Sequence, residues 1–226
     1  MRPGSTLQYN IASELIERIG VGRREAWVDD HSVYFAACNN QKGLVAFKSH
    51  ILTAEIRSLI GEGRAKVLTC FRDVRDVVAS WQAKAGQKQS IGEALSLAGN
   101  AIAQFSEWEM IDPAIRLLSR YEDFAFDIGG EARRVADFLG LEMDNSIALS
   151  LSSALSVVSL QQRLASLPED GLTRRGGFAW DSKTLVHTNH LNGGIAGRAK
   201  EELSRDLYCA ITDLHADWLV AHGYSL

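Results

Sequence analysis

Short apolar segments alternate with amphipathic helical segments between residues 44 and 140, and this alternation constrains the fold more than any other feature. Residues 66–71 (Lys-Val-Leu-Thr-Cys-Phe) form an apolar, strand-like run, and residues 73–84 then repeat apolar side chains at helical spacing. Strands of a parallel sheet are near-continuous apolar runs because both of their faces are covered. The alternation therefore predicts a three-layer α/β fold, in which helices flank a parallel sheet.

The rest of the pattern extends this prediction along the chain. We expect helices over residues 5–19, 53–60, 73–84, 90–110 and 130–139, and strands over residues 44–47, 66–71 and 114–118. Residues 144–166 have a weak helical pattern, residues 168–198 are typical of a loop, and residues 201–222 predict one closing helix. Ser90 and Glu93 have the spacing of a capping box. No repeat or low-complexity linker interrupts the pattern, so we expect a single domain over residues 1–226.

The charge and cysteine content argue against several classes of protein. Lys and Arg total 24 and Asp and Glu total 28, and the resulting net charge of −4 argues against a protein that coats nucleic acid. The cysteines Cys38, Cys70 and Cys209 show neither zinc-ligand spacing nor a disulfide framework, which indicates buried thiols in a reducing compartment. No apolar run reaches the ~18 residues of a membrane span, and no signal-peptide core is visible. We therefore expect a cytoplasmic protein without a transmembrane segment.

Two polar motifs lie where an α/β fold binds anions. Residues 2–6 (Arg-Pro-Gly-Ser-Thr) place a glycine turn and two hydroxyls before a helix, whose free N–H groups and positive dipole end favour a phosphate. A simple helix cap is the alternative. Residues 48–50 (Lys-Ser-His) follow a predicted strand and bring a cation and an imidazole together. A histidine of ordinary pKa, roughly 6.5, can act as a base near neutral pH. A solvated loop is the alternative for this motif.

The third motif is the most distinctive. Residues 71–80 (Phe-Arg-Asp-Val-Arg-Asp-Val-Val-Ala-Ser) place Arg72 at the end of a strand and Ser80 two turns into the next helix. A guanidinium binds phosphate through paired donors, and a hydroxyl at this distance could add another donor. Asp73 and Asp76 are interpreted as a helix cap and as a partner on the helix surface.

The fourth motif, residues 119–124 (Ser-Arg-Tyr-Glu-Asp-Phe), places Tyr121 after a strand, where it contacts a nucleotide base or packs in the core. In this order, the four motifs resemble those of the sulfotransferases that use 3'-phosphoadenosine 5'-phosphosulfate (PAPS). The patterns of that family are P-K/R-S-G-S/T-T, K-S/T-H, R-D-P-R-D-x-x-x-S and Y-E-D-L. The segments here are M-R-P-G-S-T, K-S-H, R-D-V-R-D-V-V-A-S and Y-E-D-F, and the resemblance covers residues 1–141.

The resemblance implies a P-loop-like sheet, PAPS as the co-substrate, and a role for each residue of the first two motifs. Arg2 looks like the cation beside the oxygen that bridges the sulfuryl group and the 5'-phosphate. Gly4, Ser5 and Thr6 are similar to the cradle of the 5'-phosphosulfate. Lys48 would lie near the transferring sulfuryl group.

Roles for the other motif residues follow from the same resemblance. His50 looks like the general base that accepts the proton of an acceptor hydroxyl. Arg72 and Ser80 are similar to the clamp on the 3'-phosphate, and Tyr121 is similar to the residue that contacts the adenine. Arg198 is a candidate to close over the 3'-phosphate from the tail of the chain. The implied reaction is a direct in-line displacement at sulfur, without a metal.

Three departures from the family patterns stand out. Pro3 occupies a position that is usually Ser, so the cradle loses one backbone N–H and one hydroxyl. Val74 replaces the usual proline of the third motif, which we expect to be harmless. Residues 190–200 lack the Arg-Lys pair of the family's basic, glycine-rich loop, and Arg198 or residues 174–175 are the candidates to substitute for it.

The cradle loop of the family follows a strand at the centre of the sheet, whereas here the loop begins at residue 2. A central strand is buried on both faces, so its absence leaves the neighbouring strands unpaired. We expect either that the native start lies upstream or that this is a shortened protein with impaired folding.

Two other functions are compatible with these motifs. A P-loop nucleotide phosphotransferase would share the sheet, but the chain lacks the G-x-x-x-x-G-K-S/T pattern. A non-catalytic nucleotide-binding protein is the second alternative, and the proline in the cradle and the degenerate tail favour it. The acceptor of a sulfotransferase is bound by variable loops. The arginine in the cradle resembles bacterial carbohydrate-modifying members, which favours a carbohydrate or glycolipid hydroxyl as the acceptor.

Overall fold

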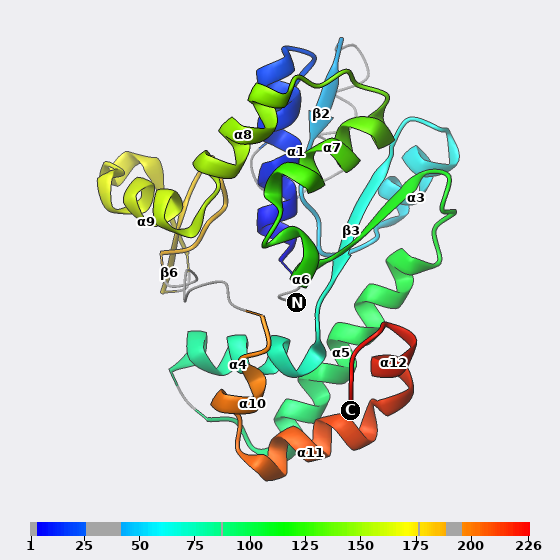
Figure 1. Cartoon of the computed structure of the whole chain (residues 1–226), viewed down its shortest axis with the longest axis vertical. Helices are drawn as coiled ribbons and strands as arrows, with labels where there is room; N and C mark the ends of the chain where they lie inside the picture. Colours follow the sequence, from blue (N-terminus) through cyan, green and yellow to red (C-terminus); the bar gives the residue numbers. More distant parts are fainter. Residues whose placement is uncertain (1–3, 26–41, 87, 176, 189–195) are drawn as a thin grey trace.

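The computed structural model describes residues 4–25, 42–86, 88–175, 177–188 and 196–226 (Figure 1). Two parallel strand pairs form its framework. Strand β1 (Gly22–Arg24) pairs with β2 (Leu44–Ala46), and β3 (Val67–Phe71) pairs with β4 (Arg116–Arg120). The predicted parallel α/β arrangement is thus confirmed, and its parallel strands form two separate pairs.

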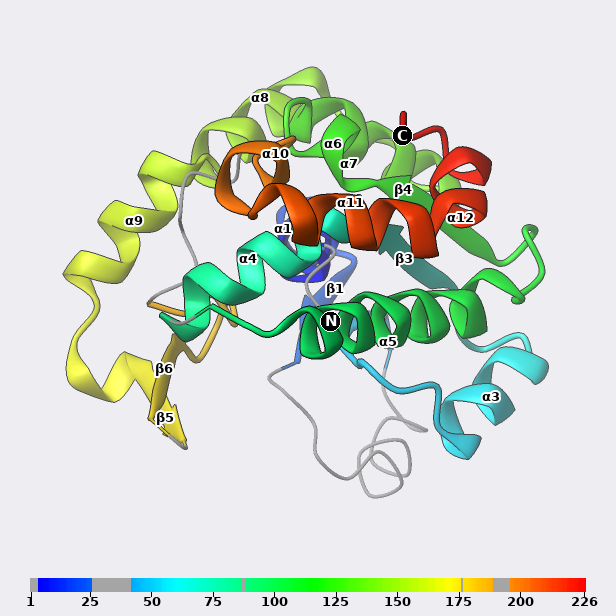
Figure 2. The same cartoon turned by 90° about the horizontal axis from the view of Figure 1, so that it is seen from below.

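Helices cover the strands on both faces. They are α1 (Ser5–Ile19), α3 (Ala54–Gly61), α4 (Val74–Ala85), α5 (Ile91–Glu109), α6 (Tyr121–Phe124), α7 (Ile128–Leu139), α8 (Asn145–Ala154), α9 (Val157–Ser166), α10 (Ala199–Glu202), α11 (Arg205–Leu214) and α12 (Ala216–Ala221). Figure 2 shows α4, α5 and α11 lying together, and these three helices contact one another. Among the described residues, no helix is long and apolar enough to cross a membrane.

Strand β3 separates two hydrophobic cores because successive side chains of a strand point to opposite faces. Cys70 belongs to the core that α1, α7 and α8 form, and Phe71 belongs to the core that α4, α5 and α11 form. The exposed Cys209 contradicts the expectation that the thiols are buried. It lies on the outer face of α11, whereas Ile211 of the same helix is fully buried. Cys38 lies outside the described residues.

Local sequence signals locate the helix starts well. Helix α1 has the predicted bounds, and the capping box of Ser90 and Glu93 is present at the start of α5. The side chains of Thr53 and Asp73 cap α3 and α4 by accepting hydrogen bonds from backbone N–H groups. Strand β4 begins two residues later than predicted.

The C-terminal third differs from the prediction. The expected loop at 168–198 contains a short 3-10 turn (Glu169–Gly171) and an antiparallel hairpin of β5 (Leu172–Arg175) and β6 (Phe178–Asp181). The expected closing helix is divided into α10, α11 and α12. The side chain of Ser204 caps a new helix, and the non-helical backbone of His215 separates α11 from α12. Such breaks depend on single polar residues, which a hydrophobic stripe does not reveal.

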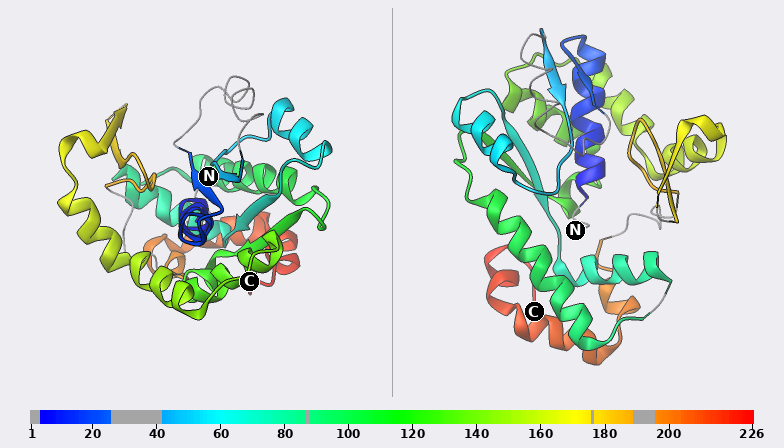
Figure 3. Two further views of the ribbon diagram at one scale, coloured as in Figure 1. Left: turned by 90° about the horizontal axis from the view of Figure 1, so that it is seen from above. Right: turned by 180° about the vertical axis from the view of Figure 1, so that it is seen from behind.

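Strands β2 and β3 do not pair with each other, and a cavity of about 690 Å³ lies between them. Helix α1, dark blue in the rear view of Figure 3, contacts both strands. Ala12 and Ile16 of α1 line the cavity. Ile56 of α3 and Trp108 of α5 line the cavity as well.

Candidate active site

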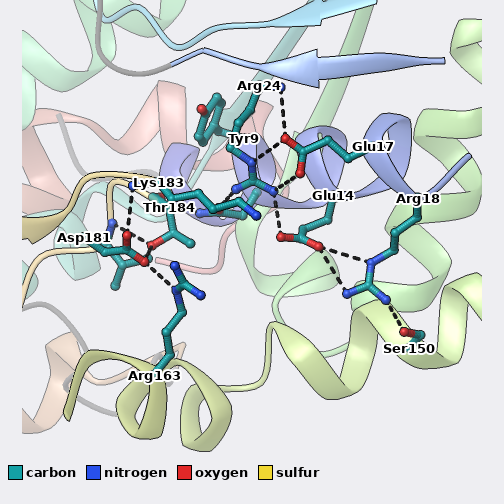
Figure 4. Close-up of polar contacts among 12 residues, drawn as sticks. Tyr9, Glu14, Glu17, Arg18, Arg24, Ser150, Arg163, Asp181, Lys183 and Thr184 are labelled. Atoms are coloured by element: carbon teal, nitrogen blue, oxygen red, sulfur yellow. Dashed lines mark hydrogen bonds and ion pairs between the residues drawn. The ribbon is translucent and has the colours of Figure 1, made fainter. Parts of the chain in front are cut away.

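Helix α1 carries the cradle motif, and a network of ion pairs fixes its position (Figure 4). Arg24 of β1 donates to Glu14 at 2.7 Å, to Glu17 at 2.8 Å and to the Asn10 amide oxygen at 3.1 Å. The Asn10 amide in turn donates to the backbone carbonyl of Thr184 at 2.8 Å. Because the network joins α1 to β1 and to the segment after β6, the first turn of α1 has a fixed place.

The first turn of α1 has the geometry of an anion site. Gly4 adopts a left-handed conformation (φ 92°), and no side chain caps the helix at this residue. The Gly4 carbonyl accepts from the backbone N–H groups of Leu7 and Gln8. The N–H groups of Ser5 and Thr6 precede the first intrahelical bonds and point towards the helix start, where the dipole favours negative charge.

The second motif meets this turn directly. The Lys48 ammonium, which follows β2, donates to the Thr6 hydroxyl at 2.6 Å. The Ser49 side chain turns away, because its hydroxyl bonds the backbone of Ile51. A cation from one motif therefore lies at the hydroxyl of the other, so the two motifs meet at the first turn of α1.

His50 is neutral at physiological pH. Burial, followed by the charge of Lys48, lowers the pKa of His50 from 6.5 to about 3. A neutral imidazole has a lone pair that can accept a proton, so its protonation state suits a general base. A base with so low a pKa is weak, and an acceptor hydroxyl beside it must gain acidity from the neighbouring positive charges.

Arg72, from the end of β3, lies over the ring of Tyr121, which follows β4. The guanidinium carbon is 4.4 Å from the ring centroid, and a guanidinium nitrogen is 3.0 Å from an Asp76 carboxylate oxygen. Burial raises the pKa of the Tyr121 phenol against the opposing charge of Arg72. The side chain of Arg72 is 10% exposed, so its charge acts where water screens it little.

Tyr121 brings the cradle and Arg72 together. A Cβ at Gly4 would come within 2.2 Å of a carbon of the Tyr121 ring, so only glycine fits here. The same ring packs edge-on against Phe124. Tyr121 is buried and packs in the core, which is one of the two alternatives that the sequence offers. Its contact with adenine stays a prediction.

Sequence reasoning missed the full role of Asp76. Its carboxylate, 1% exposed, accepts from Arg72 and also from the backbone N–H groups of Gly197 at 2.7 Å and Ala199 at 2.8 Å. It therefore holds the turn that contains Arg198 beside Arg72. Arg72 and Asp76 are four residues apart at a helix start, a spacing that is typical of an ion pair. No local sequence pattern predicts the contact between Asp76 and the tail of the chain.

The remaining predicted residues have different surroundings. Ser80 lies half-buried on α4, two turns beyond Arg72. Arg198 forms an ion pair with Glu202 in the turn that Asp76 holds. Arg174 pairs with Glu169 in the exposed β5–β6 hairpin, so we drop it as a substitute for the tail cations. Arg2 lies outside the described residues.

A second polar contact ties the C-terminus to these strand ends. Glu122 accepts from the backbone N–H of Asp73 at 3.0 Å and from the Tyr224 hydroxyl at 2.9 Å. Burial and the charge of Glu122 raise the pKa of the Tyr224 phenol. No group of His, Cys, Asp and Glu side chains that could hold a metal occurs among the residues that the structure describes.

Comparison with known proteins agrees with this arrangement. The model of the sulfotransferase domain family matches residues 7–177. Mouse sulfotransferase SULT7A1 in complex with PAP is similar in structure, with a TM-score of 0.69 and 13% identity over 96% of this chain and 80% of that one. A retinol dehydratase in complex with androsterone and the inactive cofactor PAP has a TM-score of 0.66 and 17% identity over 100% of this chain and 80% of that one. No curated protein sequence matches the chain.

The family match covers most of the chain, and the structural likeness extends over nearly all of it. Both agree with the motifs gathered around α1, β2, β3 and β4. The chain belongs to the sulfotransferase domain family.

Proposed function

We propose that the protein transfers a sulfuryl group from PAPS to an acceptor hydroxyl. The observation that carries this proposal is the place of Tyr121, which contacts Gly4 of the cradle and lies under Arg72. Lys48 bonds Thr6 in the helix turn that begins at Gly4, and Arg72, paired with Asp76, lies over the ring that Gly4 meets. A nucleotide with an anionic group at both its 5' and 3' positions fits such a pair of sites.

Different residues serve different parts of an in-line displacement. The N–H groups of Ser5 and Thr6 and the Lys48 ammonium stabilise negative charge that develops on the leaving phosphate. His50 accepts the proton of the acceptor hydroxyl. As the oxygen of that hydroxyl forms its bond to sulfur, the bond between sulfur and the phosphate oxygen breaks. Arg72 and the turn at Arg198 hold the 3'-phosphate. PAPS supplies the activated sulfuryl group.

The family match and the arrangement of the site also bear on the two alternative functions. The family match favours sulfuryl transfer over phosphoryl transfer. A non-catalytic nucleotide-binding protein would keep the Arg72 site and lose turnover. For the acceptor we propose a carbohydrate or glycolipid hydroxyl, because the arginine-containing cradle resembles the carbohydrate-modifying members. One of the two similar structures is a retinol dehydratase in complex with androsterone, so a panel of sugars, steroids and retinoids tests this choice. We also keep the expectation of a cytoplasmic protein.

Calorimetric titration without metal tests the nucleotide site. We expect 3',5'-diphosphoadenosine to bind and AMP to bind at least tenfold more weakly, since AMP lacks the phosphate that Arg72 would hold. Equal affinity for the two nucleotides would contradict the proposal.

Turnover of a His50→Ala variant tests the base. We expect a loss of about 10²–10⁴-fold with nucleotide affinity retained. His215→Gln, at the C-terminal end of α11, is the matched control and is expected to keep full turnover. An unchanged turnover rate in His50→Ala would show that His50 is not the base. If the unmodified chain binds the nucleotide tightly but shows no turnover, the protein is the non-catalytic alternative.

A further inference from the structure

The contact between Arg72 and Tyr121 joins the ends of two neighbouring strands. Arg72 directly follows β3 and Tyr121 directly follows β4, and these two strands are parallel. The next residues along the two segments, Asp73 and Glu122, are also joined. The backbone N–H of Asp73 donates to one carboxylate oxygen of Glu122 at 3.0 Å. The side chain of Glu122 therefore holds the two strand ends in a fixed relation.

Tyr224, in the segment after α12, holds the same carboxylate. Its hydroxyl donates to the second oxygen of Glu122 at 2.9 Å. Its ring is buried and packs edge-on against Phe71, with 6.2 Å between the ring centroids. Tyr224 thus contacts the residue before Arg72 with its ring. Through Glu122, its hydroxyl is linked to the residue after Arg72.

Arg75 closes these contacts into a circuit. Its guanidinium donates to the two carboxylate oxygens of Asp73, at 2.9 and 2.7 Å, and to the backbone carbonyl of Ser225 at 2.9 Å. A guanidinium that contacts a carboxylate through two donors fixes its orientation as well as its distance. Because Ser225 adjoins Tyr224, the contacts start at Asp73, pass through Glu122 and return to Asp73.

Arg120 supplies the charge that balances Glu122. Its guanidinium carbon lies 4.4 Å from the centroid of the Tyr224 ring, and its Nε lies 3.4 Å from an oxygen of Glu122. The side chain of Glu122 is mostly buried, and its two oxygens already accept from Asp73 and Tyr224. A carboxylate repels an anionic ligand, so these contacts suit Glu122 to orient its neighbours.

We propose that Glu122, held by Tyr224, is a positioning residue that sets the Arg72 guanidinium over the Tyr121 ring. The inference rests on the proposed function, in which Arg72 contacts the 3'-phosphate of the nucleotide. A misplacement of about 1 Å at a binding group can cost up to about 100-fold. Loss of the circuit therefore lowers the preference for a nucleotide with a 3'-phosphate, although no group that contacts the nucleotide is removed.

Tyr224→Phe tests the proposal, because it removes one hydroxyl and keeps the ring against Phe71. Calorimetry gives the ratio of the Kd of AMP to that of 3',5'-diphosphoadenosine, and we expect this ratio to fall about threefold. Tyr9→Phe is the matched control, since it removes a hydroxyl that bonds the Glu25 carbonyl elsewhere, and it should leave the ratio unchanged. An unchanged ratio in Tyr224→Phe would overturn the proposal. A ratio of one in the unmodified chain would instead contradict the proposed function.

Two substitutions of Glu122 separate its geometry from its charge. Glu122→Gln keeps an oxygen that can accept from the Asp73 N–H, and we expect the ratio of the two Kd values to stay within twofold of the unmodified chain. Glu122→Ala removes both acceptors and should lower the ratio about tenfold. Equal ratios in the two variants would overturn the positioning role. Tyr224→Phe keeps the proposal testable where Glu122→Ala does not fold.

An NMR measurement without nucleotide tests the same role independently of the proposed function. The Arg72 guanidinium lies over the Tyr121 ring, so the ring current shifts its N–H signals. We expect Tyr224→Phe to move these signals towards those of a free arginine and to speed amide exchange at Asp73. Tyr9→Phe should do neither. Unmoved Arg72 signals in Tyr224→Phe would overturn the proposal whether or not the chain binds a nucleotide.

Discussion

Arg24 and Arg72 are both nearly buried arginines, with side chains 7% and 10% exposed, but they have different kinds of partner. Arg24 meets two carboxylates and an amide, all from α1. Arg72 meets Asp76, which it shares with two backbone N–H groups of the tail, and the face of a tyrosine ring.

The proposed function gives the two arginines different roles, a structural one for Arg24 and contact with the 3'-phosphate for Arg72. Carboxylates surround Arg24 and offset the cost of removing its charge from water. The carboxylate of Asp76, which pairs with Arg72, also accepts from two backbone N–H groups of the tail. An anion at Arg24 would meet two carboxylates, whereas Asp76 links Arg72 to the 197–199 turn, which the proposed function places at the 3'-phosphate.

Removal of Arg24 has the largest expected effect on stability. Arg24→Met removes the cation that Glu14 and Glu17 share, and Glu14 keeps its pair with Arg18. Because these carboxylates are partly exposed, we expect a loss of about 2–3 kcal/mol in the free energy of unfolding. Urea denaturation measures the loss. Arg23→Met is the matched control, since Arg23 forms an exposed pair with Glu25 that is worth less than about 1 kcal/mol. Equal losses in the two variants would contradict the structural role of Arg24.

Removal of Arg72 has its largest effect on binding. We expect Arg72→Ala to weaken 3',5'-diphosphoadenosine by about 10–100-fold, the cost of lost hydrogen bonds to a charged group, and to leave AMP binding nearly unchanged. Calorimetry of both nucleotides measures this. Arg134→Ala, at an exposed position on α7, is the control. The same loss for both nucleotides would show that Arg72 does not distinguish the 3'-phosphate.

Substitution of Asp76 should have a smaller, indirect effect on nucleotide binding. Asp76→Asn removes the charge that orients Arg72 and places an amide donor among the N–H groups of the 197–199 turn. We expect faster amide exchange at Gly197 and Ala199 and about fivefold weaker nucleotide binding, a difference of about 1 kcal/mol. Asp137→Asn, on the exposed face of α7, should change neither. Weaker binding without faster exchange would limit Asp76 to orienting Arg72.

The smallest expected effect is on the pH dependence of stability. Burial raises the pKa of Glu17, but its bonds to Arg24 outweigh burial and lower the pKa below the ordinary 4.5. A carboxylate whose pKa is lower in the folded state stabilises the fold above its unfolded pKa, and the contribution is lost as the pH falls through the folded value. The stability gap between the unmodified chain and Arg24→Met should therefore narrow below about pH 4.5. A difference in unfolding free energy between the two chains that widens on acidification would contradict this prediction.

Much of the fold was predictable because it depends on neighbours in sequence. Helix α1 follows from the spacing of Ile11, Leu15 and their neighbours, and the start of α5 follows from Ser90 and Glu93. Strand β3 follows from one apolar run. The motif residues were also identified by their order along the chain, and the structure places Gly4, Thr6, Lys48, Arg72 and Tyr121 together.

The tertiary structure alone decided the features that depend on distant residues. Strand β1 is only Gly-Arg-Arg, and its pairing with β2, together with the acidic residues of α1, makes these arginines part of the fold. The turn at 197–199 lies in the site because Asp76, more than 120 residues away, accepts its backbone N–H groups. The sequence by itself determined the elements and the chemistry of the motifs. Which backbone edges remain open and which carboxylate binds which donor were decided by packing, because those contacts join segments that local patterns do not relate.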